Sequence, residues 1–351
     1  MFTRTQNNPW LKRFAAFTAL STLGLIVIGG LVTSHGAGMA VPDWPTTYGY
    51  NMFLFPISQW VGGIFYEHTH RLVASGVGLL TTILAVWLWV KEERRWLRWL
   101  GVIAFVAVVF QGVLGGLRVT LYKQELGIFH ATLAQLFLLL ISSIALFLSP
   151  LWQKLAGLKK KVLFPVILRP LVLGSTLLIL LQLILGASMR HQHAGLAVPD
   201  FPLAYGQLYP PTDPEFVHEA NARRLDVREF SPITAGQIHL HMAHRITAVL
   251  ILFAVAGCAL VAWRSSLPVV FKRFAYGWLG LILVQATLGA WTVWSNKAAD
   301  IATAHVLGGA LSLVCGGLFY LALQRIYQPA TELVAGGEPS RAVPQGTGAF
   351  A

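Results

Sequence analysis

Eight apolar runs, each near the length needed to cross a membrane, constrain the fold of this chain more than any other feature. A membrane-spanning helix needs about 20 consecutive apolar residues. The runs occupy residues 14–34, 72–90, 100–120, 127–148, 171–189, 245–263, 274–294 and 303–323. Only 11% of the residues are charged, against about 25% in soluble domains. The sequence therefore predicts an all-α polytopic membrane protein with eight transmembrane helices.

Basic residues lie in alternate loops between these runs, which predicts the orientation of the chain. The clusters are Arg4, Lys12 and Arg13; Lys91, Arg94, Arg95 and Arg98; Lys154, Lys159, Lys160, Lys161 and Arg169; and Arg264, Lys272 and Arg273. Lysine and arginine are enriched in cytoplasmic loops, so both termini are expected in the cytoplasm, and the first run is expected to be a retained helix rather than a cleaved signal. The net charge of +12 follows from these clusters, and nucleic-acid binding is not expected.

Motifs in the first half of the chain recur in the same order in the second half. The repeated pairs are Val41 to Pro45 with Val198 to Pro202, Gln111 to Gly115 with Gln285 to Gly289, and Phe129 to Ala131 with Ala304 to Val306. Such self-similarity indicates a duplicated unit, here two tandem pseudo-symmetric four-helix bundles. We expect an N-terminal half at residues 1–155, a C-terminal half at 156–328 and a disordered cytoplasmic tail at 329–351.

Four histidines occupy matching positions in the two halves, near the predicted outer face. They open the second, fourth, sixth and eighth predicted helices and are His70, His130, His244 and His305. Two imidazoles that face each other inside a bundle can take both axial positions of a haem iron. His70 with His130, and His244 with His305, are therefore candidate axial ligands of two haem-sized sites.

Small residues lie one helical turn after each of these histidines, at Ala74, Ala134, Ala248 and Gly309. They would leave room for a flat macrocycle beside the ligand. Small residues are also common wherever membrane helices pack together, so this pattern adds little by itself.

Other metal sites fit the sequence less well. A zinc site needs three or four clustered ligands, but His239, His241 and His244 do not share one helix face. Cys258 and Cys315 lie deep in predicted spans and are interpreted as core residues rather than a disulfide or metal pair.

Charged residues next to two of the histidines differ between the halves. Arg71 and Arg245 directly follow His70 and His244, and an arginine fork suits a haem propionate; an interfacial arginine that only reaches toward water is the alternative. Glu67 precedes His70 by three residues and so lies on the same helix face. A carboxylate there could transfer protons in oxidation chemistry.

Taken in order, these motifs closely resemble those of the heme A synthase family over about residues 12–325. The resemblance implies a haem-dependent oxidoreductase of the bacterial cell membrane. Such an enzyme oxidises the C8 methyl of haem O to a formyl group in two successive steps, which gives haem A for terminal oxidases. No cysteine lies between Ser34 and Tyr66, so the chain resembles the branch of the family that lacks a cysteine pair in the first outer loop.

The resemblance also implies roles for the candidate residues. Haem b would be held in the C-terminal half by His244, His305 and Arg245, and the substrate haem O in the N-terminal half by His70, His130 and Arg71, with Glu67 as the catalytic residue. The implied partners are the farnesyltransferase that makes haem O and an electron donor, and a homo-oligomer is left open.

Two other functions share the same ligands and topology. A di-haem b electron-transfer cytochrome would need no counterpart of Glu67, whose place in the second half is taken by His241. A haem exporter would be favoured by helices broken at mid-membrane, and the sequence has no strong Gly/Pro break there. The roles of the remaining candidates are left open; these are His35, His191, His193, His239 and His241.

Overall fold

The computed structural model describes residues 8–158, 165–223 and 232–327, and its regular structure within these ranges is helical. The long helices are α1 (Pro9–Ser34), α2 (Gly62–Lys91), α3 (Arg95–Thr120), α4 (Gln124–Leu148), α6 (Leu168–His191), α8 (Ala235–Arg264), α9 (Val269–Trp294) and α10 (Ala299–Ile326). Two shorter helices are α5 (Pro150–Leu158) and α7 (Pro214–Arg223), and single 3-10 turns are Met52–Leu54, Ile57–Gln59 and Ala194–Leu196. The eight long helices are apolar enough to span a membrane, which confirms the predicted polytopic all-α fold.

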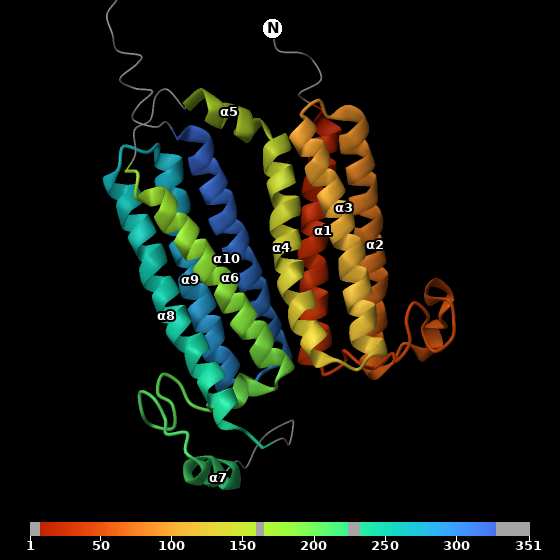
Figure 1. The fold of residues 1–351 in the computed structure, drawn as a ribbon, viewed down its shortest axis with the longest axis vertical. Helices are drawn as coiled ribbons and strands as arrows, with labels where there is room; N and C mark the ends of the chain where they lie inside the picture. Colours follow the sequence, from red (N-terminus) through yellow and green to blue (C-terminus); the bar gives the residue numbers. More distant parts are fainter. Residues whose placement is uncertain (1–7, 159–164, 224–231, 328–351) are drawn as a thin grey trace, which may run out of the picture.

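The long helices form two four-helix bundles that lie side by side, with α5 crossing from one to the other (Figure 1). In the first bundle neighbours pack in the order α1, α2, α3, α4 and back to α1. In the second the order is α6, α8, α9, α10 and back to α6. The bundles meet where α1 packs on α10, α6 packs on α4, and α4 packs on α10. Because α1 corresponds to α6 and α4 to α10, this interface is itself pseudo-symmetric.

The boundary between the halves at residues 155 and 156 stays a prediction, and it falls within α5. The predicted tail at 329–351 lies outside the described residues. The first outer loop, residues 35–61 between α1 and α2, and the described part of the second, residues 192–223 and 232–234 between α6 and α8, lie at the end of the bundles opposite α5 (Figure 1).

The helices that carry the four histidines start earlier than the apolar runs. α2 begins at Gly62 and α8 at Ala235, whereas the runs start at 72 and 245. The extra turns of α8 begin at a capping box in which Thr234 and Gln237 satisfy each other's backbone N–H groups. His70 and His244 therefore lie in the third turn of their helices and do not open them, which corrects the prediction. Hydropathy marks only the apolar segment of a helix and misses polar turns that continue it.

Apolar packing concentrates toward the α5 end of both bundles. In the second bundle the core includes Trp278 and Phe319, and in the first it includes Leu84, Ile141 and Ile144. Membrane helices gain stability mainly from such close van der Waals contact. The histidines lie nearer the other end, where the outer loops are attached.

An ordered turn joins α2 to α3 at the α5 end. Arg94 binds the Glu92 carboxylate at 2.8 Å and also donates to the carbonyl of Phe147 at the end of α4. Burial acts to raise the pKa of Glu92, but the hydrogen bonds and charge of Arg94 outweigh it and hold this pKa below its usual value. Arg94, one of the basic residues of this loop, therefore joins the end of α2 to the end of α4.

Candidate functional site

Each of the four histidines packs against a glycine on the preceding helix of its bundle. A Cβ placed on Gly29 of α1 would lie 3.1 Å from Cε1 of His70, and one on Gly115 of α3 would lie 3.3 Å from Cε1 of His130. In the second bundle the corresponding distances are 3.3 Å from Gly186 to His244 and 3.1 Å from Gly289 to His305. The same close approach of backbone to imidazole therefore occurs four times, at positions related by the repeat.

The histidines of the second bundle face each other across its core. The ring centroids of His244 and His305 are 6.3 Å apart, and their planes are inclined by 66°. This distance suits one metal ion between two imidazole nitrogens. A metal–imidazole bond is about 2 Å long, and the distance from each nitrogen to the centroid of its own ring accounts for the remainder. α8 and α10 are diagonal partners in their bundle, so the two rings meet in the bundle interior, which is where helix bundles bind cofactors.

The histidines of the first bundle lie on the equivalent diagonal pair, α2 and α4. His70 and His130 are close enough to interact electrostatically. In His70, His130 and His244 the Nδ1 atom is buried without a hydrogen-bond partner among the described residues. In His305, by contrast, Nδ1 lies 3.1 Å from the backbone carbonyl of Gln285, which leaves Nε2 of that ring to bind a metal ion. Among the residues that the structure describes, no group of three or more His, Cys, Asp or Glu side chains could hold a metal ion, and a two-ligand haem site needs none.

A glutamine fixes the helix backbone beside three of the four histidines. The Nε2 amide of Gln111 donates to the carbonyl of His130 at 3.2 Å, that of Gln182 to His244 at 3.0 Å, and that of Gln285 to His305 at 2.7 Å. Each glutamine lies four residues before the glycine that packs on the same histidine. The position four residues before Gly29 is Leu25, which has no amide. The repeat matches Gln111 with Gln285 in the sequence, but their hydrogen bonds to the histidine carbonyls could not be predicted from it.

Glu67 and Arg71 bind the first outer loop to α2. Glu67 is 3% exposed, accepts a hydrogen bond from the Val41 backbone N–H at 2.9 Å, and forms an ion pair with Arg71 at 2.7 Å. Arg71 also donates to the backbone carbonyls of Val41, Asp43 and Thr46. Both residues therefore have a structural role in the loop, which the sequence analysis did not anticipate.

The second half repeats this arrangement with one substitution. Arg245 donates to the carbonyls of Val198, Asp200 and Leu203. His241 takes the place of Glu67 and accepts from the Val198 N–H through Nδ1 at 3.3 Å. The Nε atom of Arg245 is buried and has no partner among the described residues. One donor of this arginine therefore remains for a bound carboxylate.

Each outer loop is held in a tight turn by an aspartate. Asp43 accepts from the backbone N–H groups of Tyr48 at 2.7 Å and Gly49 at 2.9 Å, and Asp200 accepts from Tyr205 and Gly206 at the same two distances. Burial acts to raise the pKa of Asp43, but hydrogen bonds from Gly49, Thr46 and Tyr48 outweigh it and lower this pKa below its usual value. The repeated loop motif thus specifies an ordered turn.

Trp44 of the first loop packs directly on Gly116 of α3. Gly116 adjoins Gly115, the glycine that packs against His130. The first loop therefore reaches the outer end of the N-terminal histidine pair. His68 supports the same loop, since its Nδ1 lies 3.1 Å from the Thr47 hydroxyl. Trp44 and Thr47 therefore anchor the first loop to α3 and α2 beside the N-terminal histidines.

Arg118 of α3 is a further candidate that the sequence analysis missed. It lies within electrostatic range of Glu67, His70 and His130, and its guanidinium packs on Gly38 of the first loop. Its Nε atom is buried without a partner among the described residues. The repeat places Thr292 at the corresponding position of α9. Arg118 could have been found from the rule that an ionisable residue within a membrane span is a functional candidate.

Two of the small residues after the histidines serve helix packing. Ala134 packs with Ile26, Leu138 and Ala310 between the bundles. A Cβ on Gly309 would lie 2.9 Å from Leu183 of α6. Small residues at these positions are explained by contact between helices, so the expected room beside the ligand does not come from them.

The remaining histidines of the sequence analysis lie at the edges of the site. His35 stacks on Tyr66 with ring centroids 4.0 Å apart, and His239 meets the Tyr209 hydroxyl at 2.7 Å. His191, at the end of α6, packs on Gly127 of α4 and lies within electrostatic range of Arg118. His191 therefore connects the second half to the N-terminal site.

Eight helices that could span a membrane, arranged in two bundles with histidines at matched positions, define this protein as a multi-pass membrane protein with a duplicated helical bundle. Residues 12–316 match the COX15-CtaA family, described as cytochrome oxidase assembly protein. The chain belongs to this family, as the resemblance in the sequence predicted.

Relatives of similar length carry the name heme A synthase. The chain is 31% identical to the heme A synthase of Geobacillus kaustophilus over 339 residues, which covers 89% of this chain and 90% of the relative. It is 27% identical to that of Geobacillus thermodenitrificans over 346 residues, with 92% and 94% covered, and 27% identical to that of Bacillus cereus over 311 residues, with 85% and 88% covered. The similarity therefore extends over both bundles.

Proposed function

We propose that this protein is a heme A synthase, which oxidises the C8 methyl group of haem O to a formyl group and so produces haem A for terminal oxidases. The observation that carries the proposal is the facing pair of His244 and His305, 6.3 Å apart between ring centroids, repeated as His70 and His130 in the other half of a chain that belongs to a cytochrome oxidase assembly family. Relatives named heme A synthase match both halves.

In this proposal the C-terminal half holds haem b. His244 and His305 would hold its iron, and Gln182 and Gln285 would keep the helices of these two histidines in position. The unpaired Nε of Arg245 would meet a propionate, since an arginine fork suits a carboxylate. The haem supplies one-electron redox chemistry when it is bound.

The N-terminal half would bind the substrate haem O between His70 and His130. Arg118 has an unpaired buried Nε and would bind a propionate of the substrate. Arg71 is occupied by three loop carbonyls and by Glu67, so its part in propionate binding would be to hold the loop against the substrate. The first loop, with Trp44 on Gly116, would exclude water from the outer edge of the site.

Glu67 is the proposed acid–base residue. Its two oxygens are held by the Val41 N–H and by Arg71, so the carboxylate is fixed at the outer edge of the N-terminal site. A displacement of the loop would free Oε2 from the Val41 N–H and allow it to take up a proton.

We further propose that the protein lies in the bacterial cell membrane with both termini in the cytoplasm and both sites near the outer face. This orientation is supported by the basic residues at the α5 end, among them Lys91, Arg95, Arg264 and Arg273. The proposed partners are the farnesyltransferase that produces haem O and an electron donor.

Haem analysis of cells tests the proposal. Cells that make haem O but have no heme A synthase of their own should accumulate haem A when this chain is expressed, and the purified protein should contain haem B together with haem O, haem A or a partly oxidised haem. A protein that contains haem B alone and leaves the haem O pool unchanged would instead be an electron-transfer cytochrome.

A further inference from the structure

An arginine near the end of α6 joins the second bundle to the first. The Nη2 atom of Arg190 donates to the backbone carbonyl of Gly30 in α1 at 2.9 Å and to the Ser34 hydroxyl at 2.6 Å. The Ser34 hydroxyl lies 3.2 Å from the hydroxyl of Thr303 in α10. Arg190 therefore lies where α1, α6 and α10 meet, at the interface between the bundles.

This position is close to a candidate histidine of each half. In the second bundle, Arg190 lies within electrostatic range of His305. In the first bundle, its acceptor Gly30 follows Gly29, the glycine that packs against His70. The arginine therefore belongs to the surroundings of both candidate sites, although it is a ligand candidate in neither.

The charge of Arg190 has no described carboxylate as a partner. Both of its hydrogen bonds go to neutral oxygens, and the ion pairs among the described residues do not include it. Arg118, by comparison, has Glu67 within electrostatic range. Removing a charge from water is costly unless the charge is paired. The positive charge of Arg190 is therefore not neutralised by the described residues around it.

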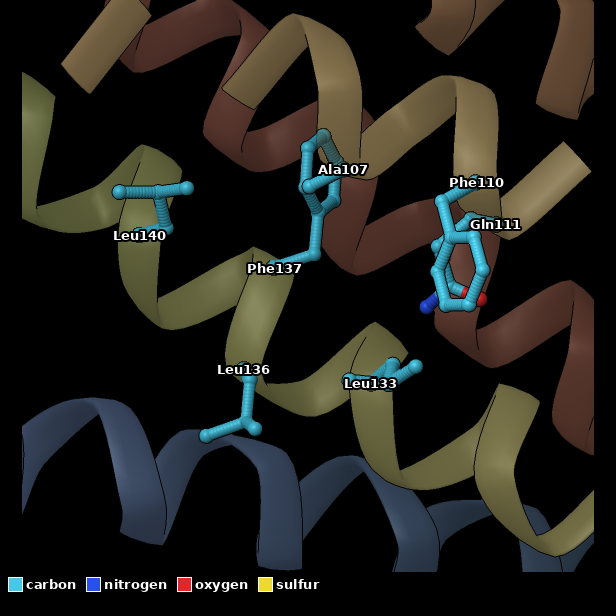
Figure 2. A pocket seen from close by; sticks show the side chains of 7 residues that line it. All are labelled: Ala107, Phe110, Gln111, Leu133, Leu136, Phe137 and Leu140. Carbon is cyan, nitrogen blue, oxygen red and sulfur yellow. The ribbon is translucent and has the colours of Figure 1, made fainter. Parts of the chain in front are cut away.

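Apolar side chains line the pockets around the interface helices. Figure 2 shows a pocket lined by α3 and α4, in which Gln111 is the one polar side chain. A second pocket, lined by α4, α6 and α10, includes Leu136, Leu180 and Leu313. Among the described residues, no charged side chain lines either pocket. A charge is screened weakly in such surroundings, so the field of Arg190 extends to neighbouring groups.

The repeat gives the first half no equivalent cation. The glycines that pack against His70 and His244 align Arg190 with Thr33 of α1. The Thr33 hydroxyl donates to the carbonyl of Gly29 within its own helix. The pseudo-symmetric interface therefore packs at the matched position without a cation. A charged residue in a membrane span that packing does not require is a functional candidate.

We propose that Arg190 raises the reduction potential of the haem that is assigned to His244 and His305. This inference rests on the proposed function. Reduction adds one electron to the haem iron, supplied by the electron donor, and lowers the positive charge of the site by one. A neighbouring cation favours this change, because it repels the more positive ferric site. Arg190 acts through its charge and does not bind the iron, and its hydrogen bonds to α1 hold the guanidinium in place.

A redox titration of the purified full-length protein with dithionite tests the proposal. The signal followed is the low-spin haem absorption that His305→Ala removes. Arg190→Gln removes the charge and keeps a hydrogen-bond donor, whereas Arg190→Lys keeps the charge. Ser34→Asp leaves the arginine in place and adds a carboxylate beside Nη2, which now lies 2.6 Å from the Ser34 hydroxyl. Arg169→Gln is the matched control, because it removes the same charge from α6 at a point about 30 Å along the helix from Arg190.

Arg190→Gln and Ser34→Asp should each lower the equilibrium constant for reduction of this haem about tenfold or more, which corresponds to about 59 mV for a one-electron couple. A unit charge about 10 Å away has an effect of this order at an effective dielectric constant of about 20. Arg190→Lys should retain most of the wild-type potential, and Arg169→Gln should retain all of it.

An unchanged potential in Arg190→Gln, or an equal decrease in Arg190→Lys or Arg169→Gln, would overturn the proposal. Lower thermal stability with an unchanged potential would assign Arg190 to the joining of the two bundles alone. If Arg190→Gln loses its haem, the potential of Ser34→Asp decides in the same way. Conversion of haem O to haem A by the wild-type protein is measured separately, so a protein that binds haem b but makes no haem A would refute the proposed function without affecting this test.

Discussion

Replacing Glu67 with glutamine separates the chemical role of this residue from its role in holding the first outer loop. The glutamine keeps an oxygen that can accept the hydrogen bond from the Val41 N–H. In the wild-type protein this nitrogen lies 2.9 Å from the Glu67 carboxylate. The glutamine loses the ion pair with Arg71, whose N–O distance is 2.7 Å. The side chain of Arg71 is 9% exposed and that of Glu67 is 4% exposed.

The structural cost follows from these contacts. Breaking a buried ion pair by removing one partner costs about 3–5 kcal/mol. Arg71 retains three backbone carbonyls as acceptors, so the cation is not left unpaired and we expect the lower end, about 3 kcal/mol in the free energy of unfolding. Loss of an acid–base group lowers turnover by about 10²- to 10⁴-fold, whereas a loosened loop alone affects mainly substrate retention.

His241 gives the matched control, because it accepts the same loop N–H in the second half. We expect Glu67→Gln to keep low-spin haem b and to accumulate haem O or partly oxidised haem. We expect His241→Gln to lower turnover less than tenfold. The assay combines extracted haem composition, the haem b spectrum and thermal stability for both variants. Equal losses of turnover in the two variants, or normal haem A production with Glu67→Gln, would refute the acid–base role and leave Glu67 as a loop anchor.

Three further outcomes are expected. His244→Ala and His305→Ala should each abolish the low-spin bis-imidazole spectrum, by loss of an axial ligand; full low-spin haem in both would refute the assignment. Arg118→Leu should weaken haem O binding in a titration more than Arg118→Lys, since lysine keeps the charge without the fork; equal binding would exclude a propionate contact. The lowered pKa of Asp43 means that its stabilisation of the loop is complete above about pH 3.9 and is lost as the pH falls through the lower folded value. Asp43→Asn should remove this acid-range change, measured as proteolysis of the first loop between pH 6 and pH 2.5.

The fold could be predicted because lipid leaves few choices. A run of about 20 apolar residues can satisfy its backbone in a membrane only as a helix, so the eight spans followed directly from hydropathy. Helix starts could not be predicted in the same way. The first turns of α2 carry Glu67 and His68, both buried by loop contacts, and a polarity scale assigns such residues to solvent.

The histidines of the candidate site were predictable from the repeat, whereas most of their supporting contacts were not. His130 and His305 stand at matched positions in the sequence. Gln182 has no recognisable partner in the first half, because α1 has Leu25 at the equivalent place, so only the structure reveals its hydrogen bond to the His244 carbonyl. Arg118 likewise has no counterpart in the repeat, because Thr292 stands at the matched position of α9. The repeat therefore does not mark Arg118 as a site residue.

The departures from symmetry fall on the N-terminal half in a way that fits an exchangeable ligand. Gln182 and Gln285 brace both histidine helices of the second bundle, and a haem held there can remain through every turnover. Among the described residues of the first bundle, only His130 has such a brace, from Gln111, and α1 has Leu25 at the position that the glutamines occupy elsewhere. In the proposed function a substrate haem would have to enter and leave the N-terminal half, and the less braced helix of His70 would make this easier. The helix of His70 also carries Glu67 and Arg71, which hold the loop, so in the proposed function a movement of the loop would act on the same helix that carries His70.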